Sequence, residues 1–185
     1  MATKTERHLT VAQYFKAYEG TAGKYELVDG IVVNMAAERV QHVRAKGDAY
    51  NALRQAIKKA KLPCEVFMDG VSLRTGKQTV REPDVAVQRG KKADPNSLTI
   101  EEPMVLVEVI SPSSEFRDVH SKLVEYFALP SVQHYIIVDQ GKGLVFHNRR
   151  DGKNKIQTQF LHGGYLELSP PGFRVKVLDL LGGTA

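Results

Sequence analysis

Hydrophobic residues recur along the chain with two periods, one typical of strands and the other typical of helices. Residues 104–110 (MVLVEVI) carry apolar side chains at both parities, which predicts a strand that is buried on both faces. Other short apolar runs end at Gly, Pro or charged residues and predict further strands. These predicted strands are 64–69, 71–75, 83–88, 134–140, 143–148, 155–162 and 173–179.

Three segments have the apolar period of amphipathic helices. The first begins after Thr10, a residue type that caps helices, and runs to about Glu19. The second covers residues 38–61 and the third covers residues 113–129. The apolar stripe of the third helix consists of Phe116, Val119, Leu123, Tyr126 and Phe127.

The order of these elements predicts a mixed sheet. Residues 24–35 predict a hairpin, because Asp29-Gly30 favours a tight turn between two short strands. The strand, helix and strand between Met104 and Asp139 require a crossover, which joins parallel neighbours. With no internal repeat or long linker, the chain is expected to form a single domain, 1–185, of the α/β (α+β) class.

Composition and charge narrow the classes of function. The chain has 26 Lys and Arg against 21 Asp and Glu, a net charge of +5 that favours an acidic polymer as partner. The single cysteine, Cys64, excludes an internal disulfide framework and a multi-cysteine zinc site. The N-terminal residues lack the apolar core of a signal peptide, and no apolar run reaches membrane-spanning length. We therefore expect a soluble, cytoplasmic protein with no membrane partner.

Two carboxylates raise the question of a metal site. Glu108 lies inside the strand 104–110, where burying an unpaired carboxylate costs several kcal/mol, so it must be neutralised, paired or bound to a metal. Asp84 follows Pro83, which marks the first residue of a strand or an edge. If the two strands are neighbours, both acids converge at one end of the sheet. A hard divalent cation such as Mg²⁺ would relieve their repulsion and could stabilise charge on a phosphodiester.

Simpler interpretations of the same residues remain open at this point. Asp84 is also a common turn or capping residue, and Glu108 could pair with one of the arginines. A glutamate in a short hairpin strand, such as Glu26, usually faces water. Two carboxylates are also the catalytic groups of a glycosidase, but the chain has no Trp to stack against a sugar.

Five motifs together resemble a known family. They are YELVDG (25–30), EPDVAV (82–87), VEVISPSS (107–114), the Asp118 and Lys122 spacing, and HYIIVD (134–139). In this order they resemble the restriction-endonuclease family called Uma-two, of the PD-(D/E)XK nuclease superfamily, over nearly the whole chain. The resemblance implies a restriction-endonuclease-like mixed β-sheet flanked by helices, with an acidic site on a central strand pair. It also implies that residues 1–185 form a PD-(D/E)XK nuclease-like domain.

The resemblance assigns roles to individual residues. Asp84 and Glu108 match the two acids that bind Mg²⁺ (or Mn²⁺), and Glu26 matches a third acid, either an outer ligand or a water-positioning group. The usual lysine of the superfamily lies two residues after the second acid, where this chain has Ile110.

Lys122 is the natural substitute for that lysine. It lies at the border of the apolar stripe of its helix, from where a lysine can extend its ammonium group along its apolar stem toward a site. The alternative is an ordinary surface pair with Asp118, four residues earlier. His42, on the second helix, is a second-rank candidate.

The sequence thus predicts a metal-dependent endonuclease that hydrolyses phosphodiester bonds, most plausibly in DNA. A homodimer is compatible with cutting two strands, but no self-complementary surface is identifiable from the sequence. The alternative function is a non-catalytic nucleic-acid-binding or regulatory protein on the same fold. Cleavage specificity, the choice between DNA and RNA, and the biological role stay undetermined at this level.

Overall fold

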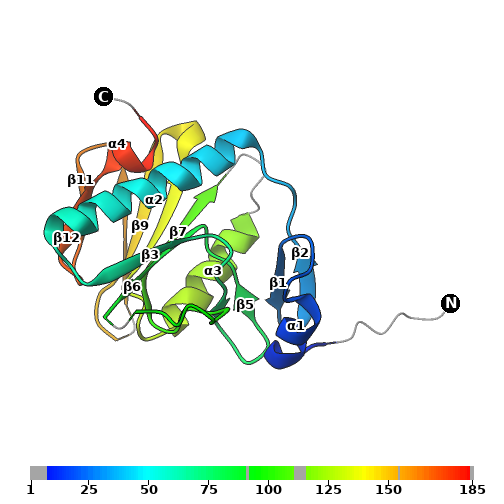
Figure 1. Ribbon diagram of the computed structural model, residues 1–185. Helices are drawn as coiled ribbons and strands as arrows, with labels where there is room; N and C mark the ends of the chain where they lie inside the picture. Colours follow the sequence, from blue (N-terminus) through cyan, green and yellow to red (C-terminus); the bar gives the residue numbers. More distant parts are fainter. Residues whose placement is uncertain (1–7, 91, 111–115, 154, 184–185) are drawn as a thin grey trace.

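The computed structural model describes residues 8–90, 92–110, 116–153 and 155–183 of the chain. A central six-stranded sheet carries the long helix α2 on one face and α3 on the other (Figure 1). A smaller sheet lies beside it, next to α1. The helices are α1 (Val11–Tyr18), α2 (Val40–Ala60), α3 (Phe116–Ala128) and α4 (Val177–Leu180), with a 3₁₀ turn η1 (Gln140–Lys142).

The six-stranded sheet contains one parallel pair in an otherwise antiparallel order. Its strands, in spatial order, are β10 (Ile156–Leu161), β9 (Leu144–Arg150), β8 (His134–Asp139), β7 (Pro103–Ile110), β6 (Val85–Arg89) and β3 (Cys64–Met68). Strands β7 and β8 are parallel and α3 connects them, as the crossover predicted. Strands β6 and β7 are antiparallel neighbours, with Val85 opposite Val107.

The smaller sheet is built around the predicted hairpin. Its order is β2 (Ile31–Asn34), β1 (Tyr25–Val28), β5 (Val80–Arg81) and β4 (Leu73–Arg74). Asp29 and Gly30 both have positive φ angles, 49° and 85°, which suit the tight turn that joins β1 and β2. A separate antiparallel pair, β11 (Tyr165–Leu168) and β12 (Phe173–Lys176), packs near α2.

Alternating residues of the central strands form two separate cores. Val85 and Val107 face α2, whereas Ala86 and Leu106 face α3. This is the pattern of a strand pair that is buried on both faces, which the uninterrupted apolar run 104–110 predicted. Glu108 shares the parity of Leu106, so its side chain is directed toward α3.

Several predicted elements need correction. The strand expected at 83–88 begins only at Val85, so Asp84 precedes it, and β6 lies inside the sheet and not at its edge. The strand expected at 71–75 has two residues and belongs to the smaller sheet. The segment expected as one strand at 173–179 divides into β12 and α4, and β5 and β11 were not predicted.

The remaining helix expectations agree with the structure. Thr10 caps α1 with a reciprocal hydrogen-bond pair to Gln13. The first residues of the third predicted helix, 113–115, lie outside the described residues. Within the described ranges, no helix is both long enough and apolar enough to cross a membrane.

Candidate active site

Asp84 and Glu108 lie side by side at one end of strands β6 and β7. The backbone N–H of Val109 donates a hydrogen bond of 2.6 Å to Asp84 Oδ2. This bond ties the Asp84 carboxylate to the residue next to Glu108. Both acids are buried, with 6% and 8% of their surface exposed. The structure therefore places Asp84, which directly precedes β6, beside Glu108 of the adjacent strand β7.

Two side chains from α3 hold the Glu108 carboxylate. The Tyr126 hydroxyl donates a hydrogen bond of 2.6 Å to Glu108 Oε1, and Lys122 Nζ lies 3.2 Å from Oε2. Burial raises the pKa of Glu108 to about 7; Asp84 adds to this rise, and Lys122 opposes it. The surroundings therefore favour the protonated form of Glu108 more than water would favour that of an exposed glutamate.

Lys122 is buried among three acids, and only 4% of its surface is exposed. Besides Glu108, its ammonium lies 3.4 Å from Glu26 Oε1 and 3.6 Å from Asp118 Oδ2. Burial by itself lowers the pKa of Lys122, but the surrounding acids outweigh this and raise it overall. The ion pair between Lys122 and Asp118 is thus present, but of its two members only Asp118 is exposed. Lys122 points inward to the predicted acids.

Glu26 is also buried, which corrects the expectation that a hairpin glutamate faces water. Arg81 Nη1 donates to its Oε2 at 2.8 Å, and the N–H of Glu82 donates to its Oε1 at 3.0 Å. Burial raises the pKa of Glu26, but Lys122, Arg81 and the N–H of Glu82 lower it more strongly, so the net shift is downward. Arg81 also forms two bonds to Glu125, which fixes the arginine against α3. Both oxygens of Glu26 therefore already have partners.

A second group of charges, which the sequence analysis did not find, lies on the α2 side of Asp84. Lys46 is 2% exposed, and its ammonium contacts Glu38 Oε2 at 2.5 Å and also contacts Asp69. The same ammonium lies 3.8 Å from Asp84 Oδ1. Lys24, near the hairpin, pairs with Asp69 and Glu38 as well. A signal was present in the sequence, since Lys46 falls on the buried side of α2 among Ala45 and Ala49, but a single lysine there is easily overlooked.

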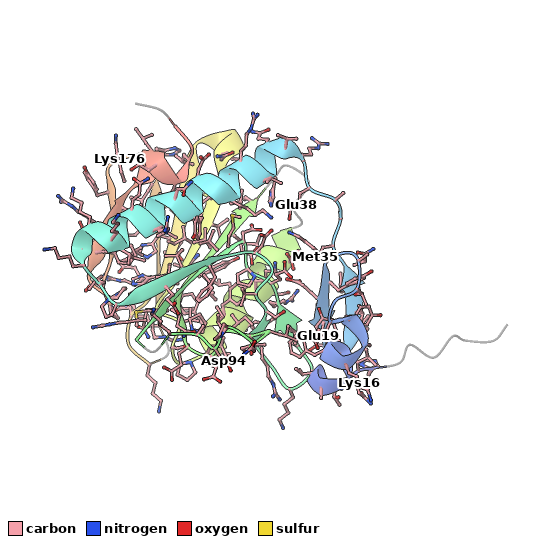
Figure 2. The ribbon with its side chains drawn as sticks, viewed as in Figure 1. Lys16, Glu19, Met35, Glu38, Asp94 and Lys176 are labelled. Carbon is pink, nitrogen blue, oxygen red and sulfur yellow. The ribbon has the colours of Figure 1, made fainter. Side chains whose placement is uncertain are left out.

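His42 belongs to this second group. Its Nε2 lies 3.7 Å from Asp84 Oδ1, and this contact raises the pKa of His42. Glu38, His42 and Asp84 each offer a ligand atom, and these atoms lie within 4.8 Å of one another. Figure 2 labels Glu38 near the start of α2. Asp84 thus contacts the lysine-centred group of α2 directly, and its neighbour Glu108 contacts the lysine of α3.

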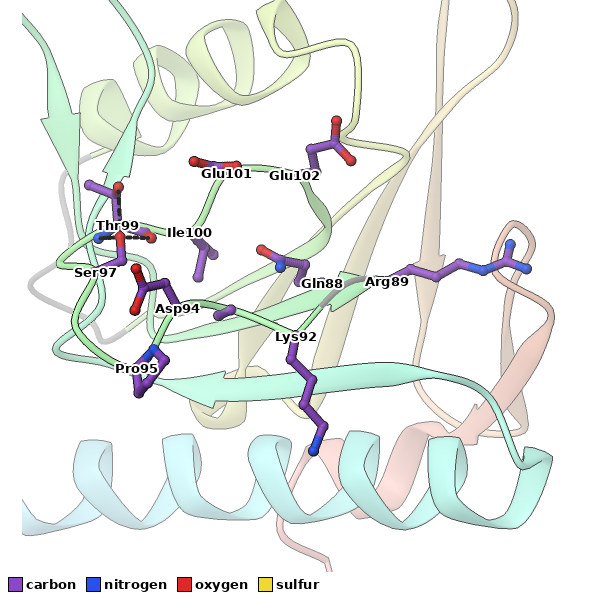
Figure 3. A pocket seen from close by; sticks show the side chains of 11 residues that line it. Gln88, Arg89, Lys92, Asp94, Pro95, Ser97, Thr99, Ile100, Glu101 and Glu102 are labelled. Carbon is purple, nitrogen blue, oxygen red and sulfur yellow. Dashed lines mark hydrogen bonds between the residues drawn. The ribbon is translucent and has the colours of Figure 1, made fainter.

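A pocket of about 390 Å³ adjoins this region. Glu38, His42, Val109 and Ile110 contribute to its lining. Ile110, at the position where the superfamily carries its lysine, therefore forms part of the wall. A larger pocket of about 640 Å³ lies at the opposite end of β6 and β7, where Figure 3 shows Arg89 and Asp94 among its lining residues. The smaller pocket is thus lined by neighbours of the predicted acids, His42 beside Asp84 and Val109 beside Glu108, and not by the acids themselves.

Comparison with known proteins identifies the family. A family model named Uma2, described as "Putative restriction endonuclease", matches residues 11–179. The chain belongs to the Uma2 family. This confirms the resemblance drawn from the five motifs and places the chain among restriction-endonuclease-like proteins.

Two individual proteins are similar to this Uma2 chain. "Uncharacterized protein sll1609" from Synechocystis sp. (strain ATCC 27184 / PCC 6803 / Kazusa) is 26% identical over 171 residues, which cover 91% of this chain and 96% of the relative. A crystal structure from Anabaena variabilis ATCC 29413, described as "a putative nuclease belonging to DUF820", matches with a TM-score of 0.75 at 14% identity. That match covers 94% of this chain and 98% of the other. It confirms the predicted fold class.

Proposed function

We propose that this Uma2 protein is an endonuclease that hydrolyses phosphodiester bonds in DNA with the help of Mg²⁺ or Mn²⁺. The observation that carries the proposal is the placement of Asp84 and Glu108. Asp84 directly precedes β6 and accepts a hydrogen bond from the Val109 N–H of the adjacent strand β7, which carries Glu108, and the buried ammonium of Lys122 lies beside Glu108. An acid pair with a neighbouring lysine is the arrangement that a metal-assisted attack on a phosphate needs.

The donor set fits a hard divalent cation. Carboxylate oxygens are the ligands that Mg²⁺ and Mn²⁺ prefer, and one or two of them with waters are sufficient for Mg²⁺. Asp84 and Glu108 would hold the ion, and His42 is within reach of Asp84 on the other side. When bound, the cation supplies Lewis acidity and lowers the pKa of a coordinated water.

The other residues orient the site in this proposal. Tyr126 holds Glu108 in one orientation through its hydroxyl. Lys122 is a preorganised cation that can donate a hydrogen bond to a phosphate oxygen and stabilise its developing charge. Glu26 positions Lys122, because its Oε1 lies 3.4 Å from the ammonium while Arg81 and the N–H of Glu82 hold the carboxylate in place. We therefore assign Glu26 a positioning role.

The same proposal treats residues 1–185 as one PD-(D/E)XK nuclease-like domain, in line with the family match to residues 11–179. The net charge of +5 favours a polyanionic substrate.

A nuclease assay with and without Mg²⁺ or Mn²⁺ tests the proposal. The wild-type protein is expected to cut DNA only with the metal, and Asp84→Asn is expected to lose cutting while its circular dichroism spectrum stays unchanged. Asp94→Asn is the matched control, because Asp94 is an exposed acid near the opposite end of the sheet. Cutting that survives EDTA, or that Asp84→Asn leaves intact, would contradict the metal mechanism.

One observation favours the alternative of a non-catalytic nucleic-acid-binding protein on the same fold. Lys122 already pairs with Glu108 and Glu26, and Lys46 already pairs with Glu38 and Asp69. Acids that are paired in this way can be purely structural. DNA binding without any cutting, and with equal affinity in Asp84→Asn, would support this alternative.

A further inference from the structure

Strand β10 leaves one edge of the six-stranded sheet open. Among the residues that the structure describes, it is the last strand on that side, and its only neighbour in the sheet is β9. All of its residues from Ile156 to Phe160 are exposed. An open strand edge presents unpaired N–H and C=O groups that can pair with another strand.

The sequence of β10 lacks the usual protection against such pairing. Natural edge strands are commonly short or carry Lys, Pro or a bulge. Residues 156–161 read IQTQFL and contain no charge, Pro or Gly. Ile156 is 40% exposed and Phe160 is 64% exposed. Lys155, just before the strand, pairs with Asp151 at 3.0 Å. The strand is thus an uncharged edge with two exposed apolar side chains.

The side-chain contacts that order β10 go to β9 and leave the outer edge available. The Thr158 hydroxyl donates to Asn148 at 2.8 Å, and Arg149 donates to Gln157 at 2.7 Å. The rings of Phe160 and Phe146 meet edge to face with centroids 5.2 Å apart. The exposed edge is therefore held in an extended, ordered shape.

We propose that β10 pairs with β10 of a second copy of this chain. The two strands run antiparallel, and a two-fold axis passes between the two copies of Thr158. A two-fold axis perpendicular to a sheet keeps each face on its own side, so only residues of equal parity can lie opposite each other. The axis must therefore lie midway between the two copies of one residue. It cannot be centred between two successive residues of the strand.

Centring the axis on Thr158 gives a self-complementary strand pair. Ile156 then lies opposite Phe160 of the second copy, and Gln157 lies opposite Gln159. Each pair occurs twice, and Thr158 meets its own copy at the centre. Pairs of aromatic with β-branched residues, and of Thr with Thr, are favourable across antiparallel strands. Centring the axis on residue 159 instead would place Leu161 opposite the amide of Gln157 and Phe160 opposite the hydroxyl of Thr158.

The proposal does not depend on the nuclease function. A single strand pair buries less surface than a standard interface of about 1,200–2,000 Å², so we expect a dimer that dissociates on dilution. Sedimentation equilibrium of the full chain from micromolar to submillimolar concentration measures this directly. The mass is expected to rise from 20.6 kDa toward twice that value.

Charge substitutions on β10 test the register. Gln157→Lys with Gln159→Lys places the two lysines of one copy opposite the two lysines of the other. The repulsion between these four charges is expected to keep the chain monomeric. Gln157→Lys with Gln159→Glu places each lysine opposite a glutamate of the second copy and is expected to restore the dimer. The charge-matched control is Asn51→Lys with Gln55→Lys, two exposed positions on α2. It is expected to dimerise like the wild type.

Three results would overturn the proposal. The first is a wild-type chain that stays monomeric over the whole concentration range. The second is a dimer that the two-lysine variant of β10 leaves intact, because the contact then lies elsewhere. The third is a Lys/Glu variant that stays monomeric, which excludes the register centred on Thr158. Circular dichroism of each variant checks that the fold is retained.

Discussion

The ammonium of Lys122 lies 3.2 Å from the carboxylate of Glu108. The two residues are 14 positions apart and come from a helix and from the strand that precedes it. Both are buried, so the attraction between them is little screened by water. Lys122 can have either of two roles in this pair, a catalytic role or a purely structural one.

Replacing Lys122 by Met is expected to have two effects. Stability falls by about 3–5 kcal/mol, because Glu26 and Glu108 lose the cation between them. Nuclease activity of the remaining folded protein falls roughly 10²-fold or more if Lys122 donates to the transition state. Urea unfolding and initial rates measure the two effects. Lys142→Met is the control, since Lys142 is 74% exposed in its pair with Asp139. A folded Lys122→Met protein that cuts at the wild-type rate would exclude the catalytic role.

A double-mutant cycle of Lys122→Met and Glu108→Gln separates the pair from its surroundings. We expect the two losses of stability to be non-additive by about 0.5–3 kcal/mol, because each substitution removes the other's partner. Additive losses would show that the two groups are stabilised independently, against the contact in the structure.

Replacing Lys46 by Met is expected to make the stability of the protein depend more strongly on Mn²⁺ than that of the wild type does. The change leaves Glu38, Asp69 and Asp84 without their shared cation, so stability is expected to fall by about 3 kcal/mol or more. Added Mn²⁺ is expected to restore part of the loss, because ligand atoms of Glu38, His42 and Asp84 lie within 4.8 Å of one another. The melting temperature with and without Mn²⁺ measures this. Adding His42→Ala is expected to weaken the rescue, and an identical rescue would exclude His42 as a ligand.

The buried histidine pair predicts a loss of stability in acid. His134 Nδ1 lies 2.8 Å from His147 Nε2, and burial lowers the pKa of each ring to about 4. The unfolded chain binds these protons below about pH 6.5, whereas the native chain does not until about pH 4. Stability is therefore expected to fall as the pH drops through this window, by on the order of 2–3 kcal/mol per histidine.

His147→Gln tests this acid response, since it removes one of the two buried sites. Urea unfolding between pH 7 and pH 4 is expected to show a shallower loss than in the wild type. His162→Gln, at an exposed position, is the control and should follow the wild-type curve. Equal slopes for all three proteins would mean that the pair does not cause the acid sensitivity.

Binding of DNA is expected to weaken steeply with salt. A net-basic protein releases condensed counterions when it contacts phosphates, so the logarithm of the affinity falls linearly with the logarithm of the salt concentration. Fluorescence anisotropy in EDTA, which prevents cutting, measures the slope. A morpholino oligomer of the same sequence lacks the phosphate charge and serves as the control. An affinity that does not change with salt would contradict an interface with the DNA backbone.

The local sequence pattern was sufficient to predict most of the helices and strands, and the central strand pair. The apolar run 104–110 gave a strand buried on both faces, and Asp29-Gly30 gave the hairpin turn. The crossover rule gave the parallel pair of β7 and β8. These features depend on backbone conformation and on burial, which neighbouring residues encode. The short strand β5 was not predictable in this way, because two residues carry no measurable period, and for the same reason the two residues of β4 were predicted as a longer strand, 71–75.

The sequence singled out Glu108 and Asp84 by their places in predicted strands, and Glu26 and Lys122 largely through the resemblance to a family. Only the tertiary structure decided which charges neutralise one another. Arg81 reaches Glu26 from the smaller sheet, and Lys46 reaches Glu38, Asp69 and Asp84 from α2. Such partners lie up to 55 positions apart in the chain. No local period records them, because an ion pair depends on where separate elements pack and not on the residues beside it.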